Sequence, residues 1–367
     1  MNAEGTDTRG PGERTDTRGP GGRTDARGPR RGRRIGYRMA TACALAGAGL
    51  LGGCGGGGQS TLHPHSGPAH DIRTLWWWML AVAGVVFLGA VGLLLLAWMR
   101  RRRPGLPLLG EDEGATVGLV VVFGFVIPAL VLVALFVVSD LGIRTTEAPA
   151  AGSTPLTVEV TGHQWFWEIR YPGTQAVTAN ELHIPVRTRV NVITKTADVI
   201  HSFWVPELNR KQDMVPGLPN RLLLYADKPG VYGGQCAEFC GAQHTHMGLL
   251  VFADPPQRFR SWLANMGAAR VAPGTPTERR GEAVFQASQC ASCHTIRGTP
   301  ARGVIGPDLT HLATRSTLAA RTIPNRPGYL GGWVLDPQHI KPESKMPGFN
   351  LSGPDFQALL AYLRSLR

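Results

Sequence analysis

Twelve residues in the second half of the chain, CAEFCGAQHTHM at 236–247, concentrate side chains that bind soft metal ions. With one upstream histidine they offer two thiols, two imidazoles and a thioether: Cys236, Cys240, His201, His244 and Met247. A single blue-type copper needs one Cys, two His and a weak axial Met, and a structural zinc is satisfied by four donors. The set therefore exceeds what one ion takes. The economical solution is two copper ions that share both thiolates as bridges, each completed by one histidine, with the methionine and the backbone carbonyl of Glu238 as weak outer ligands.

Two plainer explanations of these residues are a zinc site of two cysteines and two histidines, and a disulfide in an exported domain. Zinc would leave Met247 and the carbonyl of Glu238 without a role. A disulfide between the two cysteines would leave both histidines idle. Two nearby histidines, His183 and His246, fit no ligand position, and we expect them to be ordinary polar residues.

A second redox motif lies near the C-terminus, where residues 290–294 read C-x-x-C-H. This spacing is typical of covalent haem c attachment. Cys290 and Cys293 would form thioethers with the porphyrin, and His294 would be the proximal iron ligand. A thioredoxin-like dithiol is the alternative, but the surrounding sequence lacks the βαβ pattern of that fold, and such a site needs no histidine.

The sixth ligand of this haem is expected to be a methionine. Methionine and histidine ligation together raise the potential of a haem, which suits an electron carrier. Met346 is the one methionine that follows residue 266. His311 and His339 are the competing candidates, and either would give a haem with two histidine ligands.

The formal net charge of +12 is unevenly distributed, because residues 1–38 hold ten arginines against five acidic residues. This tail repeats a similar unit every nine residues, from Thr6, Thr15 and Thr24, and has almost no apolar side chains. Such a segment cannot offset its ordering entropy, so we expect 1–38 to be a disordered repeat tail. We do not expect nucleic acid as a partner.

An export signal follows the tail. Arginines between residues 30 and 38 precede an apolar run, 40–51, which ends in small residues before Cys54. A basic region, a short apolar region and small residues indicate a signal segment at 39–54. Small residues directly before a cysteine resemble a bacterial lipoprotein signal, in which Cys54 becomes the lipid-bearing first residue. A simple signal with an incidental cysteine is the alternative.

Two apolar runs of 24 residues each, 75–98 and 115–138, are predicted to be transmembrane helices. As a helix, each run reaches about 36 Å, which spans a bilayer. Tryptophans stand at both ends of the first run, and four arginines, 100–103, follow it directly. Because basic residues at the edge of a span mark the cytoplasmic side, the chain is predicted to cross inward and then outward. Both metal motifs would then lie outside the cytoplasm.

The region after the spans alternates between apolar and polar residues with a period of two, which predicts β-strands. The expected strands, separated by Pro and Gly, cover 156–160, 163–171, 181–184, 187–194, 221–225 and 249–252. This pattern predicts a β-sandwich over 155–268, closed by a helix at 259–266. A Pro- and Gly-containing linker, 269–276, separates it from a C-terminal domain at 277–367. That domain is expected to end in a helix capped by Ser352, which packs against a helix that contains Phe285.

The copper-binding pattern, C-x-E-x-C-x3-H-x2-M with a distant histidine, resembles the dinuclear CuA centre of cytochrome c oxidase subunit II. This resemblance implies a cupredoxin fold for the sandwich and a two-helix membrane anchor before it. It also implies that Trp165, in the run GHQWFWE at 162–168, is the residue through which electrons enter, whereas Trp167 serves packing. The carboxylate of Glu238 would help to bind a magnesium ion shared with the catalytic subunit.

One departure from this family concerns proton uptake. Many members carry a glutamate near the cytoplasmic start of the second helix, and Val121 stands at that position here. Glu111 and Glu113 lie further out along the chain and are possible substitutes. The usual proton route is therefore in question for this chain.

The C-terminal domain resembles class I cytochrome c, on the pattern of Gly281 and Phe285 before the haem motif, GPDL at 306–309, and Met346 followed by Pro347. The resemblance favours Met346 as the sixth ligand. The expected architecture is multidomain: a two-helix transmembrane hairpin, then a cupredoxin-like β-sandwich, then a small all-α cytochrome c domain. Residues 75–367 thus resemble subunit II of a caa3-type oxidase, which has a fused cytochrome c.

This resemblance implies a subunit that passes electrons from haem c to CuA and on to a catalytic partner that reduces O2 to water and pumps protons. The expected partners are oxidase subunits I and III and a cytochrome c or bc1-type donor. The expected location is the bacterial inner membrane, with the redox domains on the periplasmic side. A subunit of a CuA-containing nitric oxide reductase and a free-standing membrane electron carrier are the alternatives.

Overall fold

The structure is a computed structural model, and it describes residues 58–102, 113–146, 150 and 152–367. These residues belong to one compact unit. The predicted repeat tail, the signal segment with Cys54, and Glu111 lie outside the described residues.

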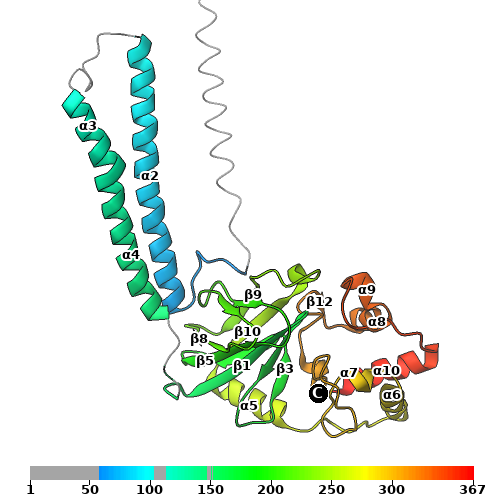
Figure 1. The fold of residues 1–367 in the computed structure, drawn as a ribbon. Helices are drawn as coiled ribbons and strands as arrows, with labels where there is room; N and C mark the ends of the chain where they lie inside the picture. The colour runs from blue at the N-terminus through cyan, green and yellow to red at the C-terminus, as the bar shows by residue number, and fades with distance from the viewer. Residues whose placement is uncertain (1–57, 103–112, 147–149, 151) are drawn as a thin grey trace, which may run out of the picture. The chain divides into compact units, whose positions relative to one another are not determined.

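The N-terminal part is a pair of long helices (Figure 1). The first is α2 (Gly67–Arg102), and the second consists of α3 (Glu113–Val121), a π-helical turn η2 (Val122–Val126) and α4 (Ile127–Thr146). Both are long and apolar enough to cross a membrane, and the predicted runs 75–98 and 115–138 lie within them. Their apolar side chains are largely exposed, as expected for helices that require lipid around them. The wide turn of η2 stands just before Pro128, which has no N–H to donate to the helix.

The first turn of α2 is joined to the sandwich by hydrogen bonds. Ser66 is fully buried; its hydroxyl accepts from the amide of Ala69 at 3.2 Å and donates to the carbonyl of Leu208. The backbone of His65 donates to the Glu207 carbonyl at 2.8 Å. This end of the helix therefore lies at the sandwich, and residues 100–102, the described arginines after the predicted span, lie at the other end.

The sandwich consists of two five-stranded sheets, with strand orders β3-β2-β1-β5-β8 and β4-β10-β9-β6-β7 (Figure 1). Its strands are β1 (Leu156–His163), β2 (Phe166–Arg170), β3 (Val177–Ala179), β4 (Glu181–Pro185), β5 (Val190–Thr196), β6 (His201–Trp204), β7 (Gln212–Met214), β8 (Asn220–Leu224), β9 (Gly230–Cys236) and β10 (Gly248–Asp254). The pairs β1–β5 and β4–β10 are parallel, and the other pairs are antiparallel. The β-sandwich predicted from period-two alternation is confirmed.

The sandwich core is formed by alternating inward-facing residues of both sheets, such as Val158 and Val160 on β1 and Leu249 and Val251 on β10, all fully buried. Trp167 is also fully buried and meets Phe203 edge to face, with ring centroids 5.8 Å apart. The prediction that Trp167 serves packing agrees with this position. The helix α5 (Pro256–Gly267) closes the domain.

One strand prediction was wrong. The run 163–171 was expected to be continuous, but β1 ends at His163, β2 begins at Phe166, and the Gln164–Trp165 peptide between them is cis. Trp165 therefore lies in a turn, and the period-two alternation does not determine its direction. This turn is held by contacts with the copper-binding loop, which alternation in one strand cannot reveal.

The C-terminal domain is mainly helical. Its elements are α6 (Pro276–Ala287), α7 (Cys290–Cys293), β11 (Thr317–Leu318), β12 (Ile323–Pro324), α8 (Pro327–Leu335), α9 (Pro337–Ile340) and α10 (Gly353–Ser365). As predicted, Ser352 caps α10: its hydroxyl accepts from the amide of Asp355 at 3.3 Å. The predicted packing of α10 against the helix that contains Phe285 is also confirmed, with Phe285 and Tyr362 in edge-to-face contact at 6.0 Å.

The crossing of α6 and α10 depends on Gly281. A Cβ added there would lie 2.0 Å from the carbonyl oxygen of Ala358, so no other residue fits without moving a backbone. This close approach brings α6, and the haem motif that follows it, against the last helix of the chain.

Candidate functional site

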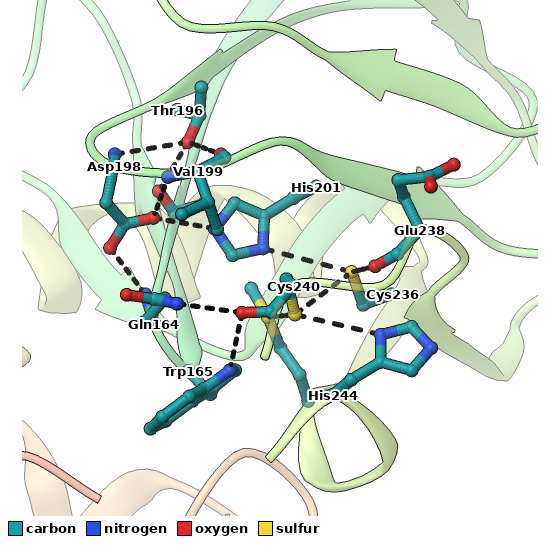
Figure 2. Close-up of polar contacts among 12 residues, drawn as sticks. Gln164, Trp165, Thr196, Asp198, Val199, His201, Cys236, Glu238, Cys240 and His244 are labelled. Atoms are coloured by element: carbon teal, nitrogen blue, oxygen red, sulfur yellow. Dashed lines mark hydrogen bonds and ion pairs between the residues drawn. The ribbon is translucent and has the colours of Figure 1, made fainter. Parts of the chain in front are cut away.

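The predicted copper ligands converge on one point of the sandwich (Figure 2). Cys236 ends β9 and His201 begins β6, two neighbouring strands, and the loop between β9 and β10 supplies the remaining donors. The thiol sulfurs of Cys236 and Cys240 lie 3.8 Å apart. The Nδ1 atom of His201 lies 3.9 Å from the first sulfur, and that of His244 lies 3.7 Å from the second.

The two weak ligands lie at the same pair of sulfurs. The thioether sulfur of Met247 is 3.8 Å from the sulfur of Cys240, and the carbonyl oxygen of Glu238 is 3.2 Å from that of Cys236. Each thiol thus has one imidazole and one weak donor beside it. This symmetric set fits two copper ions with bridging thiolates. Both cysteines are free, so the disulfide alternative does not describe this structure.

The two thiols are electrostatically coupled. The hydrogen bond from Cys240 lowers the pKa of Cys236 to about 3, and the contact with His201 acts in the same direction. The same thiol pairing raises the pKa of Cys240. Without metal the pair therefore shares one proton, which must leave when both sulfurs become ligands.

His201 is held in place by a carboxylate contact that the sequence reading missed. Its Nε2 lies 2.8 Å from Oδ1 of Asp198, and its side chain is completely buried. A carboxylate on the far ring nitrogen fixes the tautomer and leaves Nδ1 free for a metal. Asp198 also accepts from the amides of Val199 and Gln164, at 2.8 and 2.7 Å. The only sequence signal was its place three residues before His201.

Trp165 contacts the copper-binding loop directly. Its indole Nε1 donates to the carbonyl oxygen of Cys240 at 3.0 Å, and Nε2 of Gln164 donates to the same oxygen at 2.8 Å (Figure 2). A hydrogen bond therefore joins the predicted point of electron transfer to the backbone of a predicted copper ligand.

Two glycines make room for these rings. A Cβ at Gly162 would lie 2.8 Å from the ring of His201, and a Cβ at Gly241 would lie 3.0 Å from the indole of Trp165. Gly241 also has φ +115°, which other residues rarely adopt. Both glycines were visible in the sequence, but the close approaches arise only in three dimensions.

The remaining polar residues near the loop have separate places. The carboxylate of Glu238 points away from the sulfurs, and its Oε2 lies 3.9 Å from Nζ of Lys211 (Figure 2). His246 is exposed and contacts Gln243, and His183 forms a buried pair with Asp254 at 2.7 Å. Neither histidine joins the cluster of thiols, as the sequence reading expected.

The predicted haem residues line one cavity, which is formed mainly by the C-terminal domain and also has sandwich residues such as Trp165 in its lining. Its chemically active lining residues are Cys290, Cys293, His294 and Met346. Its apolar walls include Phe285, Leu309, Leu330, Val334, Phe349 and Leu359. An apolar cavity with two thiols, an imidazole and a thioether fits covalently attached haem c.

His294 is oriented as a proximal ligand requires. Its Nδ1 lies 2.8 Å from the carbonyl oxygen of Pro307, so Nδ1 carries the proton. The lone pair of Nε2 is then available to bind iron. Gly306 lies against the ring, where a Cβ would approach to 2.4 Å. Burial lowers the pKa of His294, which keeps the ring neutral.

The competing sixth ligands lie elsewhere. Met346 lines the cavity, whereas neither His311 nor His339 does. His311 is buried, with Nε2 at 3.1 Å from the carbonyl of Ala268, and His339 is exposed. The geometry favours the methionine.

A buried arginine is a further residue that the sequence reading missed. Arg315 lines the haem cavity, and its Nε is buried without a hydrogen-bond partner in the described structure. Its guanidinium donates to the carbonyl of Asp308 and does not form an ion pair among the described residues. A buried cation whose Nε has no partner, at an apolar cavity, fits a group with acidic substituents, as haem has.

The fold and the two sites define a class of protein: a membrane-anchored electron-transfer subunit with a cupredoxin-like copper domain and a cytochrome c domain. A family model for the periplasmic domain of cytochrome c oxidase subunit II matches residues 175–253, and a cytochrome c model matches residues 278–367. The chain belongs to the cytochrome c oxidase subunit II family, with a cytochrome c domain in the same polypeptide.

Two relatives that carry the name of this subunit agree with the assignment. Cytochrome c oxidase subunit 2 of Alkalihalophilus pseudofirmus is 34% identical over 294 residues, which cover 79% of this chain and 84% of that protein. The subunit 2 of Bacillus sp. (strain PS3) is 32% identical, over 58% of this chain and 62% of that protein. The solved periplasmic domain of subunit II from Bradyrhizobium japonicum is 31% identical and covers 31% of this chain and 94% of that domain, with a TM-score of 0.30.

Membership in this family gives the chain its general role: it is the subunit through which electrons enter a haem-copper oxidase, with subunit I as its partner. The family also implies copper in the sandwich and haem in the C-terminal domain. The two apolar helices and the match to a periplasmic domain fit a membrane protein with an extracytoplasmic domain.

Proposed function

We propose that this chain passes electrons from its cytochrome c domain to its copper domain and from there to the catalytic subunit, which reduces O2 to water and pumps protons. A cytochrome c or a bc1-type complex is the proposed donor, and subunit III is a further proposed partner. The proposed location is the bacterial inner membrane, with residues 155–268 and 277–367 on the periplasmic side and helices at 75–98 and 115–138.

The observation that most strongly supports this route between the two domains is the position of Trp165. Its indole donates to the carbonyl of Cys240 in the copper-binding loop, and the residue also lines the cavity that contains His294 and Met346. One residue therefore contacts both predicted redox sites. No comparable bridge is needed if the two domains serve unrelated partners.

The proposed ligands follow from the geometry above. The copper ligands are His201, Cys236, Glu238, Cys240, His244 and Met247, and the haem residues are Cys290, Cys293, His294 and Met346. Bound at these residues, copper and haem would each supply a one-electron redox centre. The chain's own residues fix the ligands: Asp198 orients one imidazole and Pro307 another.

Glu238 has a second proposed role as a magnesium ligand shared with the catalytic subunit. Its carboxylate is partly exposed and points away from the thiols (Figure 2), which leaves it accessible to a partner. Carboxylate oxygen is a preferred ligand of magnesium. Retention of magnesium by the purified complex of the Glu238→Gln variant tests this role.

The experiment that tests the proposed function is purification of the complex followed by transient reduction of the cytochrome c domain. We expect the copper band to bleach as the haem reoxidises, and oxygen consumption to follow. A complex without a haem-copper partner would favour a free-standing carrier, and a partner active on nitric oxide would favour a reductase. The absence of a copper band after copper loading would contradict the proposed site.

A further inference from the structure

Two of the contacts between the cytochrome c domain and the sandwich are made by buried charges that are not proposed ligands of either redox site. Lys341, which directly follows α9, is 3% exposed, and Glu181, at the start of β4, is 4% exposed. Each reaches from its own domain into the other. Buried charges are rare unless their hydrogen-bonding capacity is satisfied.

Lys341 binds the backbone of the copper domain. Its Nζ donates to the carbonyl of Trp165 and to the carbonyl of His246, both at 2.7 Å. The first acceptor belongs to the residue that contacts the copper-binding loop, and the second directly precedes Met247. Burial lowers the pKa of Lys341 to about 7. Either protonation state of the amine retains the two hydrogens that these carbonyls accept.

Glu181 makes the reciprocal contact. Its Oε1 accepts from the amide of Ser316 at 2.8 Å, from the hydroxyl of Ser316 at 2.6 Å and from the amide of Thr317 at 3.0 Å. These donors open β11, in the wall of the cytochrome c domain. A buried carboxylate that accepts several donors is well satisfied, but it loses all of them if the domains separate.

The segment between the two contacts is strained. Ala319, Ala320 and Arg321 all have positive φ, at 52°, 56° and 66°, which residues with a Cβ rarely adopt in succession. Ala320 accepts a hydrogen bond from the amide of Gly248 in the sandwich, at 3.1 Å. Such a turn persists when its surroundings hold it, and here the other domain supplies a contact.

We propose that Lys341 and Glu181 form a reciprocal latch that holds the haem cavity of the cytochrome c domain against Trp165. The latch rests on the proposed route between the domains, because it positions the two ends of that route. Lys341 and Glu181 are positioning residues: each acts by orienting the opposite domain. Arg297 makes a further contact between the domains: it donates to the carbonyls of Met266 and Gly267, beside the linker, and of Gln175 in the sandwich.

The test removes one contact and measures hydrogen exchange at amides beside the other contact, in the full copper- and haem-loaded complex. In Lys341→Met, hydrogen exchange is measured at the amides of Ser316 and Thr317, which Lys341 does not touch. In Glu181→Gln, it is measured at the amide of Gly248. We expect exchange to accelerate about tenfold or more in each variant, the equilibrium effect of losing one charge-assisted hydrogen bond. Unchanged exchange at these distant amides would overturn the latch.

Electron transfer between the domains supplies the second measurement. We expect Lys341→Met to slow the transfer that follows photoreduction of the cytochrome c domain, with the optical spectra of haem and copper unchanged. Lys228→Met and Glu343→Gln, which alter exposed charges of the two domains, are matched controls and should retain the parent rate. Faster exchange with an unchanged transfer rate would overturn the positioning role. Absence of transfer in the parent protein would instead contradict the proposed function.

Discussion

The indole nitrogen of Trp165 donates a hydrogen bond to the carbonyl oxygen of Cys240 at 3.0 Å. The two segments lie so close that a Cβ at Gly241 would crowd the indole. Trp165 is thereby fixed against the copper-binding loop, although it is not a proposed copper ligand. Its own carbonyl accepts from Lys341 of the cytochrome c domain. The residue is thus bonded on both sides, to one domain through its side chain and to the other through its backbone.

Trp165→Phe should slow electron transfer between the domains and leave the copper spectrum intact. The substitution removes the indole donor, at a cost to stability of about 1 kcal/mol, and it shortens the ring that lies between the sites. Transient absorption after reduction of the cytochrome c domain measures the effect. Trp204→Phe, at a partly exposed position of β6, is the control. Equal rates in both variants would exclude Trp165 from the route.

Asp198→Asn should weaken copper binding about 10–100-fold, the usual effect of losing the outer partner of a histidine ligand. The carboxylate accepts from His201 at 2.8 Å, and an amide at this position accepts less strongly. Copper retention against a competing chelator measures the change. Asp213→Asn alters an exposed carboxylate of β7 that contacts no proposed ligand and should retain copper. Equal retention by both variants would contradict the orienting role.

Met346→Ala should lower the reduction potential of the haem and change its visible spectrum, because the thioether ligand raises the potential. Met346 lines the haem cavity, whereas His339 is exposed. His339→Ala should therefore leave both measurements unchanged. A shift in the histidine variant with none in the methionine variant would reverse the ligand assignment.

Acid should destabilise the cytochrome c domain in part through His311. Burial lowers the pKa of His311 below its ordinary 6.5. As pH falls through 6.5, the unfolded chain takes up a proton that the folded chain does not, so the free energy of unfolding falls with it. His311→Gln should reduce the drop in melting temperature between about pH 7.5 and 5. His339→Gln, at an exposed histidine, should keep the full drop; an identical profile in both would remove His311 as a cause.

Gly281→Ala should destabilise the cytochrome c domain by about 1–3 kcal/mol or more, because the added Cβ would lie 2.0 Å from the Ala358 carbonyl and must displace a helix. Gly328→Ala, in α8, places its Cβ where no atom lies within 4 Å and should be neutral or slightly stabilising. Denaturant unfolding, followed by haem absorbance, measures both. A neutral Gly281→Ala would show that α6 and α10 are free to separate.

The sequence by itself determined the chemistry and most of the architecture. Ligand type and spacing identified the copper and haem motifs, since a short loop keeps its donors close wherever it folds. Apolar length indicated the two long helices, and alternation indicated the sandwich. Most of these signals lie within one stretch of the sequence; the ligand candidates His201 and Met346, which stand apart from their motifs, are the exceptions.

Only the tertiary structure decided which distant residues support the sites. The turn that places Trp165 against the carbonyl of Cys240 joins segments 75 residues apart in the chain, and Arg315 reaches the haem cavity only in the folded domain. Asp198 is close to His201 in the sequence, but only the structure shows that its carboxylate contacts the ring. Lys341 and Glu181 are ordinary charged residues in the sequence. Their proposed positioning role depends on the carbonyls and amides that the opposite domain offers. Hydrogen bonds to backbone atoms leave no trace in residue type, because every residue offers the same carbonyl and nearly every one the same amide.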